Sequence, residues 1–481
     1  MKKIRIETLG CRLNQIESEA TAKYFIDKGF SVVADNVTSA ATGDSDTILT
    51  IINTCTVTQK AEQKARRMIR LFIKKFPNSA VLVTGCYAQL SPEEIQNIDD
   101  RICVVGGQIK SRLVEVPEIL ADFITELNKN GKEWNPVYFA NLINDKVKNH
   151  PQAKKSFPED SFKLSTSSFI AHSRASLKIQ DGCNNCCSYC AIHIARGHSV
   201  SIDVQTAIDR VIELENTGHD EVVLTTVNIG QYRGFYNGEY LNFSQLLKKL
   251  LENTKKINFR ISSLYPEIVD EEFCKVISDS RVRPHFHLSV QSGSDKILKL
   301  MNRAYCAADV VNACDLIRTA KKDPFIACDI ITGFPGEEDC DFEETMNLCN
   351  RCDFSWVHAF PYSERPGTVA ATMKHKVPQS VSGERSKHLT NWAKNNKIKY
   401  INKFIGKQVP AVLETVRRPA VFFPDKGTYI YHAVTENFIH CEIQSSLVMQ
   451  AGKTILVEIE KPLEDRIEKG GEIEAIGKII K

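Results

Sequence analysis

The sequence predicts a multidomain α/β protein with three folded parts: a parallel α/β domain, a partial (β/α)6 barrel and a small β-barrel. Three patterns predict these parts. Strands and helices alternate from residue 1 to about residue 140, and six strand–helix repeats follow over residues 174–362. Short alternating strands then occupy residues 408–481. We place the domains at residues 1–126, 173–404 and 405–481, with a polar linker at residues 127–172.

The composition is that of an ordinary globular protein, with 42% hydrophobic and 25% charged residues. No apolar run reaches the ~18 residues of a membrane span, and the first residues lack the apolar core of a signal peptide. We therefore expect a cytoplasmic protein with no membrane partner. The net charge of +3 is too small to indicate a nucleic-acid partner by itself.

In the N-terminal domain, three cysteines each follow a predicted strand. The strands are residues 4–8, 47–52 and 80–84, and the cysteines are Cys11, Cys55 and Cys86. The carboxyl ends of parallel strands share one edge of the sheet, so the three thiols are expected to converge on a ligand site there. The alternative is three unrelated buried cysteines.

A second cysteine group, Cys183–Cys190, is far denser. Two adjacent Cys-x-x-Cys pairs would offer four zinc ligands, but zinc sites normally separate such pairs by a loop of roughly 12–20 residues. The other spacing uses Cys183, Cys187 and Cys190, with Cys186 as a bystander and an aromatic residue, Tyr189, before the last ligand. Three thiolates at that spacing suit a [4Fe–4S] cluster with one iron free of protein ligands.

Between residues 174 and 362 the predicted strands lie near Leu177, Val222, Phe259, Phe286, Cys328 and Val357. Polar or glycine-rich loops follow the strands, and in barrels of this kind the chemistry lies at the carboxyl ends of the strands. The loops together therefore predict one site. Within the linker we expect one short strand at residues 137–140.

The group Cys183–Cys190 resembles the signature of radical S-adenosylmethionine enzymes. The segments around Cys11, Cys55 and Cys86, together with residues 285–295 and 301–303, resemble methylthiotransferase motifs, and the final barrel resembles an RNA-binding TRAM domain. The resemblance implies two [4Fe–4S] clusters, an auxiliary one on the N-terminal cysteines and one on Cys183, Cys187 and Cys190 that binds S-adenosylmethionine. Further contacts to S-adenosylmethionine are expected from the strand-end residues Thr226, Asn228, Ser289 and Gln291.

Two residues depart from the family pattern. Thr226 stands where the family usually has glycine, which affects the predicted contact at that strand, and His193 stands where proline is common. The cluster ligands are unaffected by either change.

The resemblance implies an enzyme that inserts a methylthio group at an unactivated C–H bond by radical chemistry. The segment from Gly10 to Glu17 looks most like the branch acting on N6-threonylcarbamoyladenosine beside the tRNA anticodon. The alternatives within the family are the isopentenyladenosine and ribosomal-protein branches. An iron–sulfur electron carrier and a non-catalytic RNA-binding protein are the alternatives of other classes.

The implied partners are the tRNA anticodon stem-loop and an electron donor such as a flavodoxin or ferredoxin system. Two basic segments are candidates for phosphate contact, residues 58–75 and residues 374–407, although a solvated charged surface explains such runs equally well. Within the second segment, Lys394, Lys397 and Lys399 are the predicted tRNA-binding residues.

Overall fold

A computed structural model describes residues 2–34, 37, 43–148, 161–169, 172–414, 420–423 and 427–480. The chain divides into two compact units. The first comprises Met1–Ala171, Lys178–Asn185 and Cys190–Ile202, and the second comprises His172–Leu177, Cys186–Tyr189 and Asp203–Lys481. None of the helices in these described ranges is long and apolar enough to cross a membrane.

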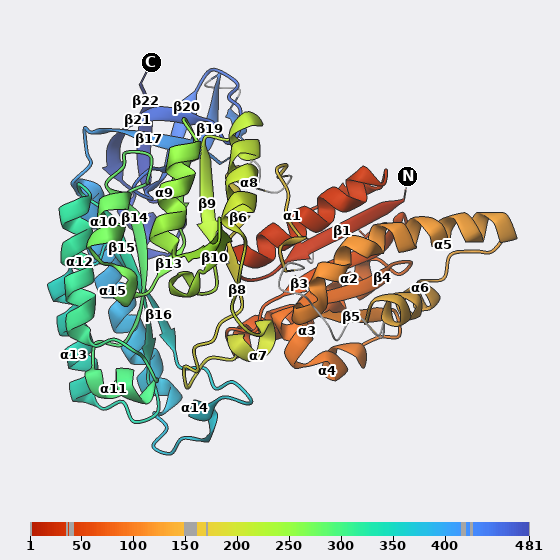
Figure 1. Ribbon diagram of the computed structural model, residues 1–481, viewed down its shortest axis with the longest axis horizontal. Helices are drawn as coiled ribbons and strands as arrows, with labels where there is room; N and C mark the ends of the chain where they lie inside the picture. The colour runs from red at the N-terminus through yellow and green to blue at the C-terminus, as the bar shows by residue number, and fades with distance from the viewer. Residues whose placement is uncertain are drawn as a thin grey trace. The chain divides into compact units, whose positions relative to one another are not determined.

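The first unit is built on a five-stranded parallel sheet in the order β2-β1-β3-β4-β5, which forms the red-to-orange part of Figure 1. The strands are β1 (Lys3–Thr8), β2 (Ser31–Val33), β3 (Thr47–Thr54), β4 (Ala80–Gly85) and β5 (Ile102–Gly106). Every residue of β3 and β4 is buried, as expected for central strands covered on both faces.

Helices cover both faces of this sheet. The helices of the unit are α1 (Arg12–Asp27), α2 (Gln59–Lys75), α3 (Cys86–Leu90), α4 (Pro92–Gln96), α5 (Val116–Asn130), α6 (Pro136–Ile143) and α7 (Ile192–Arg196). Alternate strand residues serve two apolar cores: Leu82 packs with α1, α5 and α6, whereas Val83 packs with α2 and α4. A two-stranded antiparallel ladder of β7 (Gln180–Asp181) and β8 (Val200–Ser201) belongs to the same unit.

The strand predicted at residues 137–140 is wrong, because these residues lie within α6. Asn135 caps this helix by accepting a hydrogen bond from the Tyr138 amide at 3.0 Å, and Pro136 occupies its first turn. Both residue types favour a helix start and outweigh the strand preference of a short aromatic run.

In the second unit, six parallel strand positions confirm the predicted partial barrel. The strands are β6 (Ala175–Lys178), β9 (Glu221–Thr225), β12 (Asn258–Ile261), β13 (Ser263–Leu264), β14 (His285–Gln291), β15 (Phe325–Thr332) and β16 (Trp356–Pro361). They form two ladders, β12-β9-β6 and β13-β14-β15-β16, with β13 directly continuing the path of β12 along the chain.

A helix follows most of these strands. The helices are α8 (Val204–Asn216), α9 (Phe243–Asn253), α10 (Glu271–Ile277), α11 (Asp295–Leu300), α12 (Ala307–Ala320), α13 (Asp339–Cys352), α14 (Val369–Thr372) and α15 (Gln379–Asn402). A hairpin of β10 (Gly234–Tyr236) and β11 (Glu239–Leu241) is inserted before α9.

The chain closes with a small barrel, at the blue end of Figure 1. Its strands are β17 (Gln408–Leu413), β18 (Val421–Phe423), β19 (Thr428–Thr435), β20 (His440–Ser445), β21 (Thr454–Pro462) and β22 (Ala475–Ile479), with α16 (Glu464–Glu468) before the last. Pairing of β17 with both β19 and β21 closes five strands into a ring. This agrees with the predicted TRAM-like barrel, and the predicted fold class is confirmed.

The closing barrel shares its core with the rest of the second unit. Phe325 of β15 and Tyr400 of α15 belong to the same apolar cluster as Tyr431 and Val457 of the barrel. A buried ion network lies beside it: Glu221 pairs with Arg174, Arg260 and Arg283, while Glu414 and Glu436 of the closing barrel pair with the outer two arginines. The domain boundaries proposed from the sequence stay predictions.

Candidate functional site

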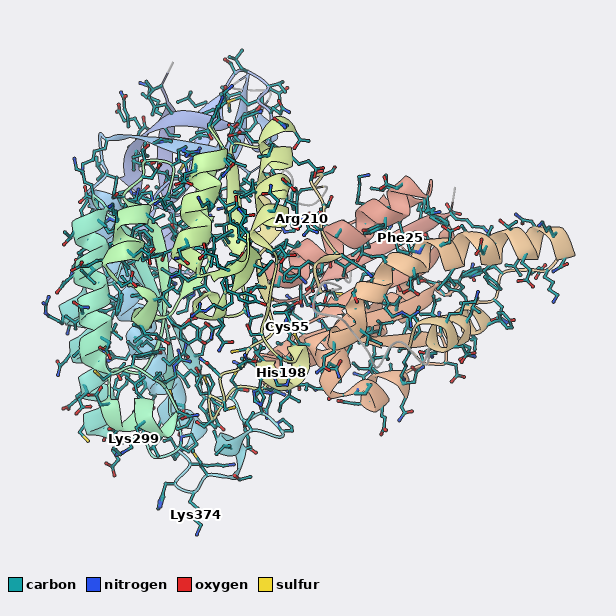
Figure 2. The ribbon with its side chains drawn as sticks, in the orientation of Figure 1. Phe25, Cys55, His198, Arg210, Lys299 and Lys374 are labelled. Atoms are coloured by element: carbon teal, nitrogen blue, oxygen red, sulfur yellow. The ribbon has the colours of Figure 1, made fainter. Side chains whose placement is uncertain are left out.

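The three N-terminal cysteines lie at the carboxyl ends of neighbouring strands. Cys11 immediately precedes α1 after β1, Cys55 follows β3, and Cys86 begins α3 directly after β4. Because β1, β3 and β4 are adjacent in the sheet, the strand-end argument from the sequence brings the cysteines to one edge. Cys55, labelled in Figure 2, is the middle member.

These thiols are close enough to affect one another. Burial raises the pKa of Cys55 to about 12, and the nearby Cys11 and Cys86 thiols add to that rise. A Cβ atom on Gly10, whose φ is +106°, would lie 2.4 Å from the Cβ of Cys55 and 2.9 Å from its sulfur. Glycine is thus required at this position, because any side chain would collide with Cys55.

Cys183, Cys187 and Cys190 lie in the loop between β7 and α7. Cys183 and Cys187 are buried and Cys190 is partly buried, whereas Cys186 is exposed. Backbone amides point at two of the sulfurs: the Asn185 amide lies 3.4 Å from Cys183 Sγ, and the Ile192 amide lies 3.5 Å from Cys190 Sγ. Hydrogen bonds to sulfur of this kind are typical of iron–sulfur ligands.

The third sulfur has a charged neighbour that sequence reasoning missed. Arg303 Nη1 lies 3.2 Å from Cys187 Sγ. The guanidinium also donates to the Ser289 carbonyl at 3.0 Å and packs over the rings of Tyr265 and Tyr305. The signal was available, because residues 301–303 form one of the motifs noted above, but nothing in their spacing indicates the contact.

The four predicted S-adenosylmethionine contacts all lie at the carboxyl ends of β9 and β14. Thr226 faces Ser262 at 3.4 Å between hydroxyl oxygens, and Asn228 accepts a hydrogen bond from the Gly230 amide at 3.1 Å. Gln291 is buried with φ +72°, an uncommon conformation for a residue other than glycine. Ser289 uses its carbonyl to hold Arg303.

For one of the three predicted tRNA-binding lysines, Lys397, the structure contradicts the prediction. Its side chain is 3% exposed, pairs with Glu474 at 3.0 Å and lies over the Phe325 ring at 4.2 Å. Burial lowers the pKa of this lysine, against the opposing effect of Glu474. A lysine with these contacts is part of the core and cannot reach a phosphate. Lys394 binds the Glu468 carbonyl, and Lys399 is exposed.

A group of metal-ligating residue types separate from both cysteine groups occurs in the closing barrel. Glu414, His432 and His440 have ligand atoms within 4.8 Å of one another. However, Arg174 already pairs with Glu414 at 2.6 Å, so a divalent cation would add charge that nothing there offsets. We assign no metal to this group.

Comparison with known proteins agrees with this geometry. A family model described as the radical SAM superfamily matches residues 177–349, and one described as the uncharacterized protein family UPF0004 matches residues 3–107. The threonylcarbamoyladenosine tRNA methylthiotransferase MtaB of Treponema pallidum is 41% identical over 450 residues, covering 86% of this chain and 91% of that protein. The chain belongs to the radical S-adenosylmethionine methylthiotransferase family.

This methylthiotransferase is also similar to a second relative and to a solved structure. The Thermotoga maritima protein of the same name is 35% identical over 446 residues, covering 91% of this chain and 92% of that protein. The solved structure of the radical S-adenosylmethionine methyltransferase TsrM from Kitasatospora setae superposes with a TM-score of 0.50 at 13% identity, covering 77% of each chain. At that identity the likeness shows the fold alone.

The cofactors of this methylthiotransferase are S-adenosylmethionine and [4Fe–4S] clusters. The residues present fit that donor set. Each cysteine group offers three thiols. The sulfurs of one group are held by amide and guanidinium donors, and those of the other lie close enough to affect one another. Which cysteines bind which cluster stays a prediction from the sequence.

Replacing Cys186 by alanine is expected to leave iron content and activity unchanged. Cys186 is exposed, so the substitution should alter the free energy of unfolding by no more than about 0.5 kcal/mol. Iron and acid-labile sulfide on anaerobically purified protein measure the outcome. If Cys186→Ala loses a cluster while Cys187→Ala retains it, the assigned ligand spacing is wrong.

Proposed function

We propose that this protein transfers a methylthio group to carbon 2 of the adenine in N6-threonylcarbamoyladenosine of tRNA. The observation that carries the proposal is the presence of two separate three-thiol groups in one chain, Cys11, Cys55 and Cys86 in one and Cys183, Cys187 and Cys190 in the other. The names of the relatives at 41% and 35% identity support the choice of substrate.

The chemistry requires more than acid–base catalysis, because an aromatic C–H bond offers no leaving group except hydride. When bound, S-adenosylmethionine and the reduced cluster supply the radical that breaks such a bond. With two sites, one group of cysteines can hold the cluster that produces the radical. The other group can hold the sulfur that is transferred to the substrate. A site with four protein thiolates would leave no iron open for either purpose.

The protein's own residues bind and orient these groups. We assign Cys183, Cys187 and Cys190 to the cluster that cleaves S-adenosylmethionine, with Arg303 donating to the Cys187 sulfur. A donor beside a ligand sulfur offsets its negative charge and holds it in place. Thr226, Asn228, Ser289 and Gln291 stay candidates for further contacts with S-adenosylmethionine, by their position at the strand ends.

Nucleoside analysis tests the substrate. Digested tRNA from a strain lacking this gene should lack 2-methylthio-N6-threonylcarbamoyladenosine and retain its unmethylthiolated precursor, and the complementing gene should restore the product. The 2-methylthio isopentenyl nucleoside serves as the internal control and should be unchanged. Loss of the isopentenyl form, or of a methylthio mark on a ribosomal protein with tRNA unchanged, would contradict the proposed substrate.

A low-potential electron donor is the second partner that we propose, of the flavodoxin or ferredoxin class, because reductive cleavage consumes one electron per S-adenosylmethionine. The tRNA substrate would place the protein in the cytoplasm.

Helix α2 is the stronger of the two candidate phosphate surfaces. Lys60, Lys64 and Arg67 are exposed and lie on one face at helical spacing, while Ala65 and Ile69 face the core. In α15 the charges are largely used within the protein. Lys397 is buried, and Arg385 pairs with Glu337 and Asp339.

Charge reversal at Lys60, Lys64 and Arg67 is expected to raise the KM for tRNA and to lower the salt dependence of binding. Each lost phosphate contact should reduce the slope of log K against log salt by about 1. Filter binding over a salt series measures it. The matched control reverses Lys248, Lys255 and Lys256, which are also exposed. Equal effects from both triples would exclude α2 as the contact surface.

A further inference from the structure

A buried network of charged side chains in the first unit carries more positive than negative charge. Its members are Glu17, Lys110, Lys178, Asp181 and Arg196. Their side chains are 1–8% exposed. Among the residues that the structure describes, three cations face two carboxylates, so the network has a net charge of +1. A buried charge that nothing offsets is costly, so an excess of this kind indicates an anionic neighbour.

The ion pairs within the network are close. Glu17 Oε1 contacts Lys110, and lies 3.3 Å from both Lys178 Nζ and Arg196 Nη1. Asp181 lies 3.0 Å from Lys178 and 2.8 Å from Arg196. Although burial would raise the pKa of Glu17, Lys110, Arg196 and Lys178 lower it to about 2. The pKa of Asp181 is lowered as well, so both carboxylates are ionised at neutral pH.

One asparagine connects this network to the cysteine-bearing loops. The Arg196 Nη2 group donates to Asn14 Oδ1 at 2.8 Å. The amide nitrogen of Asn14 in turn donates to the Leu9 carbonyl at 2.9 Å and to the Thr54 carbonyl at 3.1 Å. Leu9 precedes Cys11 by two residues, and Thr54 immediately precedes Cys55. Arg196 is thus fixed against the loops that carry two of the three thiols.

Helix α7, which carries Arg196, packs against α3, which begins at Cys86. Burial raises the pKa of Cys86, and the positive charges of Arg196 and Lys110 oppose that rise. For Arg196, the groups that favour its charged form against burial are Asp181, Glu17, Cys86 and Cys11, in that order. Cys86 and Cys11 therefore lie close enough to Arg196 to interact with its charge.

We infer that Arg196 and Lys110 are the counter-charge of the auxiliary cluster on Cys11, Cys55 and Cys86, and that they set its reduction potential. This inference rests on the ligand set proposed above. A [4Fe–4S]²⁺ cluster on three thiolates carries a net charge of about −1, which matches the +1 of the network. Adding an electron makes the cluster more negative, so a fixed positive charge beside it favours the reduced form and raises the potential.

The second unit supplies an internal comparison. Its network contains three charges of each sign, and its two outer carboxylates are partly exposed. The members are Arg174, Arg260 and Arg283 against Glu221, Glu414 and Glu436. That network is balanced and has no group of cysteines in its ion pairs. The network with the excess charge is the one joined to the cysteine loops.

The test is a redox titration of the auxiliary cluster, followed by electron paramagnetic resonance. Two forms of the full chain are reconstituted anaerobically: the wild type, and a variant with Cys183, Cys187 and Cys190 replaced by alanine. In the variant, the signal of the auxiliary cluster is measured by itself. Arg196→Gln should shift the midpoint to more negative potential, and Glu17→Gln should shift it to more positive potential. Arg196→Lys, which keeps the charge, should stay near wild type.

Arg101→Gln is the matched control. Arg101 also forms an ion pair, with Asp99 at 2.9 Å, but it precedes β5 and so lies at the opposite edge of the sheet from the cysteines. The Arg101→Gln substitution should leave the midpoint potential of the auxiliary cluster unchanged. If Arg196→Gln does not hold a cluster, Lys110→Gln replaces it, with the same expected direction.

Three results would overturn the inference. Shifts of the same sign in Arg196→Gln and Glu17→Gln would indicate loosened structure, since opposite charges were removed. Shifts no larger than in Arg101→Gln would show that the charge does not act on the cluster. A wild-type midpoint that moves with chloride or phosphate would mean that a soluble anion offsets the network, bound in the cavity of about 280 Å³ that Lys110 and Arg196 line. An unchanged auxiliary signal after replacing Cys11, Cys55 and Cys86 would instead refute the ligand set.

Discussion

Replacing Cys11, Cys55 and Cys86 together by alanine is expected to abolish methylthio product while S-adenosylmethionine is still cleaved to 5′-deoxyadenosine. The substitution removes the proposed auxiliary ligands, so iron per chain should fall by about half. Reductive cleavage should continue, because it depends on the other three cysteines. Chromatography of the nucleosides, with iron analysis of the same preparation, measures both effects.

Cys103→Ala is the matched control for this triple substitution. Cys103 is a fully buried cysteine of β5, in the same sheet, and its thiol lies 3.8 Å from the Val81 carbonyl. It should retain both clusters and full product. Loss of 5′-deoxyadenosine from the triple variant, with its fold intact by circular dichroism, would mean that the two cysteine groups have been assigned the wrong way round.

Replacing Cys183, Cys187 and Cys190 together should have the opposite pattern. Cleavage of S-adenosylmethionine should fall to background, and with it all product, while about half of the iron remains on the N-terminal cysteines. Anaerobic turnover with dithionite, quantified as 5′-deoxyadenosine, measures the loss. Cys186→Ala, from the same loop, controls for the loop itself. Residual cleavage in the triple variant would place the radical cluster elsewhere.

The places of the cysteines in the fold could be predicted from the sequence because they follow from local rules, whereas their roles as cluster ligands stay predictions. Cys11, Cys55 and Cys86 each follow a strand recognisable by its own apolar residues. Because these strands are adjacent and parallel, the three cysteines lie at the same edge of the sheet. Cys183, Cys187 and Cys190 are neighbours in the chain, so no tertiary contact is needed to place them together.

The charged partners could not be found in the same way. The Arg196–Glu17 contact joins residues 179 positions apart, and nothing in the local pattern of either residue indicates the other. The same reason accounts for Lys397. The basic residues near Lys397 in the sequence predict an exposed lysine. Its partner Glu474, however, lies directly before the last strand of the closing barrel, far away in the sequence. Charge in a sequence window indicates an exposed surface only until a distant segment covers it.

Phe325, Tyr400 and Lys397 have a consequence for how this chain could be recombined with its relatives. These residues belong to the barrel strand β15 and to α15, yet they pack against rings and carboxylates contributed by residues 405–481. A chimera that exchanges only the closing barrel would cut through one apolar core and leave the Lys397 ammonium buried without Glu474. Exchange of the closing barrel would therefore require compensating changes in α15 and β15, which makes this barrel a poor candidate for transfer between family members as an independent module.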